Sequence, residues 1–205
     1  MALPGSRAQN RAMEPVTLAT DRLLLRAVGP ADSDAVYEAA QDPEILRWTT
    51  VPSPYRHEHA RGFTGQVVPE GWADDSMFTW GLFLPEGERL AGMLGLTMRS
   101  VSEAEIGFWG TEEHRGNGYV TEGVLAVCRW AFVRLSLDRV EWRAEVGNRP
   151  SRAVAERAGF TLEGTLRSAL VHRGVRRDCW VGSLLPSDLG LASSAPYLPA
   201  GGGPA

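Results

Sequence analysis

The amino-acid sequence predicts a mixed α/β fold in which helices flank a mainly antiparallel sheet of about seven strands. Apolar stretches of strand length recur along the chain, and segments with helical periodicity separate them. Three of these stretches follow one another through short turns, so the strands they predict are antiparallel neighbours. A helix then joins the third of them to the next strand, and a helical connection makes that pair of strands parallel.

Size and composition are those of a single globular domain. The chain has 205 residues, of which 43% are hydrophobic and 22% charged, and its net charge is −4. This acidic balance gives no reason to expect binding to nucleic acid or to an anionic membrane. No apolar run reaches the ~18 residues that span a bilayer, and the first residues lack the apolar core of a signal peptide. A cytoplasmic location is therefore expected.

The cysteines and the basic residues limit the chemistry further. Cys128 falls in a helical pattern and Cys179 in a strand pattern, with no CxxC spacing and no cluster of histidines. We therefore expect structural thiols and no metal site. All 21 basic residues are arginine. Any contact with a phosphate must use guanidinium groups or backbone amides.

The first half of the chain contains one strand, a group of helices and a strand hairpin. Residues 1–14 show no periodicity and are expected to form a flexible N-terminal segment, so the folded domain should cover residues 15–185. Gly29 and Pro30 end the first strand, and Asp32 or Ser33 can cap the helix that follows. The expected elements are a strand at 16–28, helices at 33–40, 42–46 and 55–68, a loop at 69–75, and strands at 77–84 and 90–98.

The second half predicts a strand, a long helix, another strand, a short helix and a closing hairpin. In the long helix Val120, Val124 and Val127 recur at helical spacing. Gly159 can end the short helix because glycine readily adopts the left-handed conformation. The strands are expected at 103–109, 138–146, 160–171 and 175–185, the helices at 120–135 and 148–158, and a disordered tail rich in Pro, Gly, Ala and Ser at 186–205.

The turn before the long helix is the clearest functional signal. It reads Arg115-Gly116-Asn117-Gly118-Tyr119-Val120 and opens directly into the helix. Free N–H groups at a helix start, with no side chains on the glycines to block approach, make a site for an anion. The turn lacks the third glycine of a dinucleotide fingerprint and the Gly-Lys-Ser/Thr of a P-loop, so a pyrophosphate suits it better than a triphosphate with Mg²⁺. A purely structural strand-to-helix turn is the alternative.

This turn resembles the Arg/Gln-x-x-Gly-x-Gly/Ala coenzyme A loop of the GNAT superfamily of N-acetyltransferases. Three further motifs are similar to the RimJ/RimL-type branch and occur in the same order within residues 16–185. They are Thr20–Arg26, Ala104–Trp109, and Asn148–Ser151 leading to Ala158–Phe160. Val120 departs from the family pattern, which has Gly or Ala there, and its larger side chain could crowd the helix start.

The resemblance implies a GNAT-like sheet whose central parallel strands splay apart, with acetyl-CoA bound in the gap as the acyl-donor co-substrate. Asn148 would hydrogen-bond the pantetheine arm, and Arg152 would reach a phosphate, with a solvated helix position as the alternative for Arg152. A homodimer is what the family suggests. The other expected contacts are Phe108, Trp109 and Gly110 along the arm, and Arg115, Gly116, Asn117, Gly118, Tyr119 and Val120 at the pyrophosphate.

Two residues are candidates for the chemistry of acyl transfer. Glu105 matches a strand position where some family members keep a catalytic glutamate, and a carboxylate on the sheet surface is the alternative. Ser151 stands where the RimL-like pattern has its proposed acid, and helix capping is its alternative. Ala155 replaces the tyrosine of many relatives, and Leu170 stands where the RimL-like branch has a carboxylate.

The expected function is transfer of acetyl from acetyl-CoA to an amine, preferably a protein N-terminal α-amine, by direct attack in a ternary complex. An α-amine with a pKa near 7.7–8.0 is roughly a third neutral at pH 7.5, whereas a lysine amine is neutral in about one part in a thousand, so an α-amine needs only a modest base. Two alternatives stay open. One is a small-molecule, antibiotic-like acceptor or a succinyl-CoA donor, and the other is a non-catalytic module that senses acyl-CoA.

Overall fold

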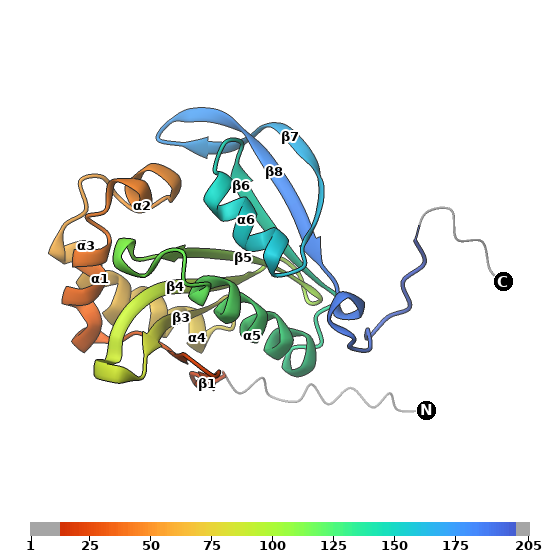
Figure 1. Cartoon of the computed structure of the whole chain (residues 1–205), viewed down its shortest axis with the longest axis horizontal. Helices are drawn as coiled ribbons and strands as arrows, with labels where there is room; N and C mark the ends of the chain where they lie inside the picture. The colour runs from red at the N-terminus through yellow and green to blue at the C-terminus, as the bar shows by residue number, and fades with distance from the viewer. Residues whose placement is uncertain (1–12, 200–205) are drawn as a thin grey trace, which may run out of the picture.

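A computed structural model describes residues 13–199 of the protein. Most of the predicted flexible segment 1–14, and residues 200–205 of the predicted tail, therefore lie outside the described residues. The described chain contains a sheet made of β1 (Leu18–Ala19), β2 (Leu24–Arg26), β3 (Met77–Leu84), β4 (Arg89–Met98), β5 (Glu103–Gly110), β6 (Arg139–Glu145), β7 (Thr161–His172) and β8 (Val175–Leu184). Its order is β1-β2-β3-β4-β5-β6-β8-β7 (Figure 1).

The predicted mixed sheet is confirmed, and β5 and β6 are its one parallel pair among the described strands. The helices are α1 (Ser33–Ala39), α2 (Pro43–Trp48), α3 (His57–Gly62), α4 (Val68–Ala73), α5 (Tyr119–Arg134) and α6 (Arg149–Arg157). Figure 1 shows α1, α2 and α3 gathered at one end of the sheet. The loop before α5 and the tip of the β7–β8 hairpin lie at the same end, so this end can combine residues from both halves of the chain.

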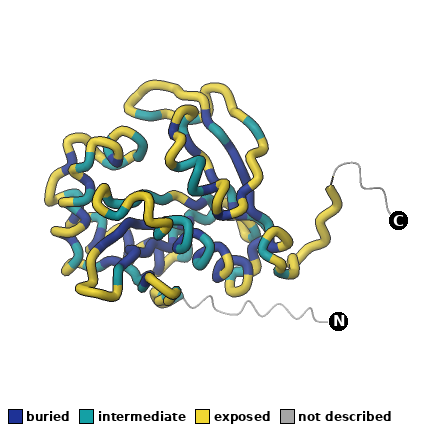
Figure 2. The backbone as a smooth tube through the Cα atoms, viewed as in Figure 1, coloured by how far each residue is buried: buried dark blue, intermediate teal, exposed yellow. Residues whose placement is uncertain are grey.

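The core is built around tryptophans that join two helices to the sheet. Trp72 of α4 and Trp130 of α5 both contact the ring of Trp80 on β3, with centroids 5.0 and 5.2 Å away. Phe78, two residues earlier on the same face of β3, touches both helices as well. Edge-to-face packing of such large rings is favourable beyond the burial of their area. Figure 2 shows buried residues in the central strands, in α5 and in the second half of β8, and exposed residues along β7 and at the tip of the hairpin.

The predicted first strand, residues 16–28, is split in the structure, and this raises the strand number from seven to eight. The Thr20 amide donates to the Leu23 carbonyl at 2.9 Å, and Thr20 Oγ1 accepts from the Leu23 amide at 3.0 Å. This turn folds β1 back onto β2, so that Leu18 pairs with Leu25. The turn consists of the polar residues Thr20, Asp21 and Arg22, and the predicted strand ran through them because apolar residues flank them on both sides.

The predicted loop at 69–75 is wrong, because the helical path continues to Ala73. Residues Phe63–Val67 form a π-helical turn, and the Val68 amide donates to the Phe63 carbonyl five residues back. Pro69 then falls in the first turn of α4, where its missing N–H costs nothing. Burial of Val68 and Trp72 holds this helix against the sheet.

Part of the segment predicted as a disordered tail, residues 186–195, is packed against the domain. Residues Pro186–Leu189 form a 3₁₀ turn, and Leu189 and Leu191 pack against the core. Further on, the Ser194 amide and hydroxyl both donate to the Asp138 carboxylate, at 3.0 and 2.7 Å. The Ser194 hydrogen bond lowers the pKa of Asp138. The composition of the tail did not predict this packing, because the leucines that provide it are spaced among small residues.

Both cysteines are buried, and neither forms a disulfide. Burial raises the pKa of the Cys128 thiol. It also raises the pKa of Cys179, where a backbone hydrogen bond from Ala144 and the charge of Arg143 oppose part of the effect. Protonated buried thiols are poor nucleophiles and poor ligands. Within residues 13–199 no cluster of three histidine, cysteine or acidic side chains suits a metal, and no helix is long and apolar enough to cross a membrane.

Candidate functional site

The loop before α5 has the backbone that the glycine pattern predicts. Gly116 and Gly118 both have φ of 80°, a conformation that favours glycine over any residue with a side chain. Gly118 is the N-cap of α5, and the first helical hydrogen bond runs from the Glu122 amide to the Gly118 carbonyl at 3.0 Å. The amides of residues 119–121 therefore have no acceptor within the helix and can face an anion.

Side chains brace this loop from two sides. The side-chain amide of Asn117 donates to the carbonyls of His114 and Arg115, at 3.2 and 3.3 Å, and so holds the turn closed. Arg22 donates to the Asn117 carbonyl at 2.9 Å while it pairs with Glu122 of α5. Arg115 forms an ion pair with Asp42, the N-cap of α2. The loop is thus tied to the first strand region and to α2.

Val120 does not obstruct the loop, although its size departs from the family pattern. A Cβ added to Gly110 would lie 3.0 Å from Cγ2 of Val120, so the valine side chain lies against the last residue of β5. The missing side chain at Gly110 provides the room that the larger Val120 needs. The amides at the helix start stay free, because the Val120 side chain packs against Gly110 of β5 and not against the loop.

The two central strands separate as the resemblance implies. β5 and β6 pair from Glu103 with Arg139 to Ile106 with Trp142, and no further. Beyond that point β5 stays paired with β4 up to Gly110, and β6 stays paired with β8 up to Glu145. The facing edges of residues 107–110 and 143–145 consequently have backbone groups free to pair with an extended amide-bearing molecule. Figure 1 shows the two strands diverging toward the end of the sheet that holds the loop before α5.

The predicted arm contacts lie on this splayed segment. Phe108 and Gly110 face the side of the sheet covered by α5 and α6, and Trp109 faces the other side because side chains alternate along a strand. Asn148, the N-cap of α6, accepts from the Ser151 amide at 3.2 Å through its Oδ1. The amide nitrogen of Asn148 remains as the group that can donate to a bound arm.

Ser151 does not cap α6, since Asn148 does. The Ser151 hydroxyl instead accepts a hydrogen bond from the indole N–H of Trp142 at 3.0 Å. Trp142 is the last residue of β6 that pairs with β5, so the hydroxyl sits where the two strands begin to separate. With one lone pair occupied by the indole, the hydroxyl proton is free to be donated elsewhere.

Glu105 lies on the opposite face of the sheet, one position before the last paired residue of β5. Its Oε2 is 2.5 Å from an Arg99 nitrogen and 3.8 Å from Nε of Arg143. Its neighbour Glu141 is paired with Arg143 and Arg139. Burial opposes the charge of Glu141, but hydrogen bonds from these two arginines outweigh it and lower the pKa of that carboxyl. Any proton that Glu105 accepts is therefore accepted inside a network of ion pairs.

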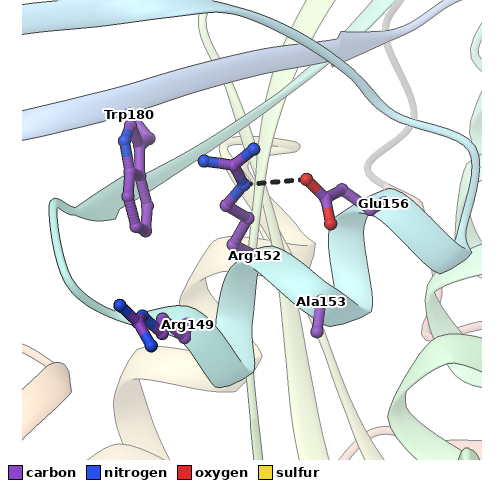
Figure 3. A pocket seen from close by; sticks show the side chains of 5 residues that line it. All are labelled: Arg149, Arg152, Ala153, Glu156 and Trp180. Atoms are coloured by element: carbon purple, nitrogen blue, oxygen red, sulfur yellow. Dashed lines mark hydrogen bonds and ion pairs between the residues drawn. The ribbon is translucent and has the colours of Figure 1, made fainter.

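Arg152 contacts residues of α6 and β8. Its Nε is 2.7 Å from Glu156 on the same helix, and its guanidinium lies over the ring of Trp180 on β8, 5.0 Å from the centroid. Figure 3 shows Arg149 and Arg152 on α6 beside Trp180. These residues line a cavity with a volume of about 430 Å³. The guanidinium is thus held toward β8, and its contact with a phosphate stays a prediction.

Sequence reasoning missed a second cluster, around Glu145 at the end of β6. Arg47 of α2 donates to both oxygens of Glu145, at 2.8 and 3.2 Å. His172 and Arg177 approach the same carboxylate at 3.4 and 3.8 Å. The Arg47 hydrogen bond leads these contacts in lowering the pKa of Glu145. The signal that could have found it is the alternation Glu141, Arg143, Glu145, which puts three charges on one face of a strand.

Known proteins resemble this chain in sequence and in fold. The model of the acetyltransferase (GNAT) domain matches residues 22–161. An uncharacterized N-acetyltransferase p20 of Bacillus licheniformis is 28% identical over 171 residues, which are 82% of this chain and 96% of that protein. The putative ribosomal N-acetyltransferase YdaF of Bacillus subtilis is 42% identical over 98 residues, 47% of this chain and 54% of that protein.

A solved structure of RimL, a ribosomal L7/L12 α-N-protein acetyltransferase in complex with coenzyme A, has the same fold. The TM-score is 0.74 at 22% identity, and the match covers 84% of this chain and 98% of that one.

Proposed function

The chain belongs to the GNAT family of acetyltransferases, and from that premise we propose that it moves the acetyl group of acetyl-CoA directly to the α-amine of a protein N-terminus. The observation that carries the proposal is one arrangement: a splayed pair of parallel strands whose open end adjoins a helix start with free amides. The name of YdaF supports a ribosomal protein as the acceptor, and the name of RimL supports a protein α-amine. The folded acetyltransferase domain is proposed to span residues 15–185, followed by the tail segment that packs back on it.

On the donor side, the pyrophosphate of acetyl-CoA would face the amides at the start of α5, and the pantetheine arm would run along residues 108–110. Arg115 would add its charge by leaving Asp42 for the phosphate, since a guanidinium pairs well with either group. Asn148 would donate its amide N–H to the arm. The thioester would then lie where β5 and β6 begin to separate.

The reaction needs a neutral amine on one side and a proton for the departing sulfur on the other. The amine nitrogen attacks the thioester carbonyl carbon, the C–S bond breaks, and coenzyme A leaves as a thiolate that takes up a proton. Ser151 is the proposed proton donor, because its hydroxyl accepts from Trp142 and keeps its own hydrogen available. Glu105 is the proposed base, acting directly or through water. A modest base is enough for an α-amine, because a large fraction of it is already neutral near pH 7.5.

Replacing Ser151 by alanine is expected to lower kcat about tenfold or more and to leave the KM for acetyl-CoA unchanged, because the hydroxyl acts on the leaving sulfur and does not hold the donor. Steady-state rates with acetyl-CoA measure both constants. Ser193→Ala, at an exposed position of the tail, is the matched control and should behave as wild type. An unchanged kcat in Ser151→Ala would remove Ser151 from the mechanism.

Replacing Glu105 by glutamine is expected to lower kcat about tenfold near pH 7, and the deficit should shrink toward pH 9. The reason is that an α-amine loses its own proton as the pH rises past 8, so a base is needed less. The pH profile of kcat tests this. Glu103→Gln, an exposed carboxylate on the same face of β5, is the control. A deficit of the same size at both pH values would contradict a role as base.

The proposed activity itself is tested by following thiol release from acetyl-CoA with a panel of amines. The panel contains peptides with a free α-amine, peptides whose only amine is lysine, and small aminoglycoside-type amines. Faster release with the α-amine peptides supports the proposal. Release with small amines alone would assign a different acceptor, and release with none of them, despite binding of acetyl-CoA, would point to a sensing module.

A further inference from the structure

A second cavity lies between α2 and the β7–β8 hairpin, with a volume of about 390 Å³. The hairpin turn at its edge has two left-handed residues, Arg173 with φ of 51° and Gly174 with φ of 76°. The Arg173 guanidinium donates to the Leu46 carbonyl of α2 at 2.5 Å and so joins the hairpin to the helix. The lining residues are Pro43, Leu46, Arg47, Ser53, His172, Arg173, Val175 and Arg177.

The charges in this cavity do not cancel. Its lining contains three arginines, and two of them, Arg47 and Arg177, approach the carboxylate of Glu145. Arg47 binds both oxygens of Glu145, so this pair neutralises itself. Arg173 donates to a neutral carbonyl, and Arg177 lies 3.8 Å from a carboxylate that Arg47 already engages. A positive cavity in a chain of net charge −4 is a site for an anion.

The cavity lies next to the proposed reaction site, on the face of the sheet opposite to α5 and α6. Glu145 ends the splayed segment of β6, and it shares the face of Glu141 and Arg143, away from α5 and α6. The other boundary, α2, is tied to the loop before α5 through Asp42 and Arg115. A molecule held in this cavity would therefore approach the thioester from the face that the donor leaves open.

The wall of the cavity also contains a buried polar atom that makes no hydrogen bond to any described residue. This atom is Nε2 of His172. The other ring nitrogen of His172 is 3.4 Å from Glu145. Buried polar atoms in folded proteins are nearly always satisfied, so a group of this kind at the edge of a charged cavity is suited to a polar ligand.

We propose that this cavity binds a carboxylate of the acceptor, so that the enzyme prefers amines that have an acidic side chain nearby in the sequence. The inference rests on the proposed function, because it assigns the acceptor class of that same site. Guanidinium groups of Arg173 and Arg177 would grip the carboxylate, since their planar forks match its two oxygens. The fixed pair of Arg47 and Glu145 would form the floor of the cavity.

The test uses three pairs of five-residue peptide amides with a free α-amine. Within a pair the peptides differ only by Glu or Gln at position two, three or four. Each is titrated by calorimetry into the protein saturated with coenzyme A, so that binding is measured without turnover. We expect a Glu peptide to bind about tenfold tighter than its Gln twin in at least one pair, the size of a charge-assisted hydrogen bond.

Two variants and one control assign the preference to the cavity. Arg177→Gln, alone and with Arg173→Gln, should bring the Glu-to-Gln ratio close to one. Arg176→Gln is the matched control, because this arginine belongs to the same hairpin but donates to the Ser168 carbonyl and does not line the cavity. Its ratio should equal that of wild type. Thermal melting of each variant confirms that the hairpin is folded.

Equal affinities within all three pairs would overturn the inference, and so would a Glu preference that survives in the double variant. The proposed function fails separately, by the absence of acetyl transfer to these peptides when acetyl-CoA replaces coenzyme A. Acidic preference without transfer would keep the cavity and reject the α-amine reaction. Transfer without acidic preference would keep the α-amine reaction and reject the cavity as a carboxylate site.

Discussion

Gly118→Val is expected to weaken acetyl-CoA binding about 100-fold or more. Gly118 has φ of 80°, and a β-branched residue is a strained outlier in that region, at a cost of order 1–3 kcal/mol. The strain is relieved by turning the loop, and this turns away the amides at the start of α5. A valine there also puts its Cβ 3.6 Å from an Arg22 nitrogen, in the bracing contact between the loop and the first strand region.

Titration calorimetry with acetyl-CoA measures this effect. Gly164→Val in β7 is the control, because that glycine has ordinary backbone geometry and open space where the side chain would go. The control should bind as wild type does. Wild-type affinity in Gly118→Val would show that the loop amides do not hold the donor.

Trp80→Ala should destabilise the fold by about 3–5 kcal/mol, the range for removing a large aromatic side chain from a core. The Trp80 side chain is fully buried, and its indole donates to the Val16 carbonyl at 2.8 Å. Alanine removes the ring contacts to Trp72 and Trp130 and leaves that carbonyl without its partner. Both α4 and α5 lose their shared attachment to β3.

Urea unfolding measures the loss of stability. Val101→Ala, on a turn where the valine is 93% exposed, is the control and should change the free energy of unfolding by less than about 0.5 kcal/mol. A loss below about 1 kcal/mol in Trp80→Ala would contradict the view that the tryptophan cluster joins the two helices to the sheet.

Much of the fold follows from local patterns in the sequence. The helical spacing of Val120, Val124 and Val127 and the left-handed Gly159 set the limits of α5 and α6 closely. The errors arise where irregular local hydrogen bonds interrupt a pattern. A polar turn at Thr20, held by its hydrogen bonds to Leu23 and to Glu122 of α5, splits the predicted first strand, and a π-helical turn lets Pro69 enter a helix. Neither leaves a periodic signal, because each depends on where neighbouring elements lie.

The candidate site also has one part that the sequence predicts and one part that only the structure shows. The glycines of the loop before α5 could be recognised from the sequence, because their pattern is typical of a left-handed backbone at the start of a helix. The splay of β5 from β6 came from the family resemblance and matches the pairing in the structure. The contacts of Ser151 with Trp142 and of Arg152 with Trp180, and the cluster around Glu145, come from residues distant in sequence. Such contacts need the sheet order to be known first.

Mass spectrometry of a single peptide tests the proposed reaction most directly. The peptide has one free α-amine and one lysine side chain, and it is incubated with the protein and acetyl-CoA. We expect one added acetyl group, which fragment ions place on the α-amine, and about tenfold less product from Ser151→Ala after the same short incubation. Acetylation of the lysine instead, or no acetylation by a protein that binds acetyl-CoA, would contradict it.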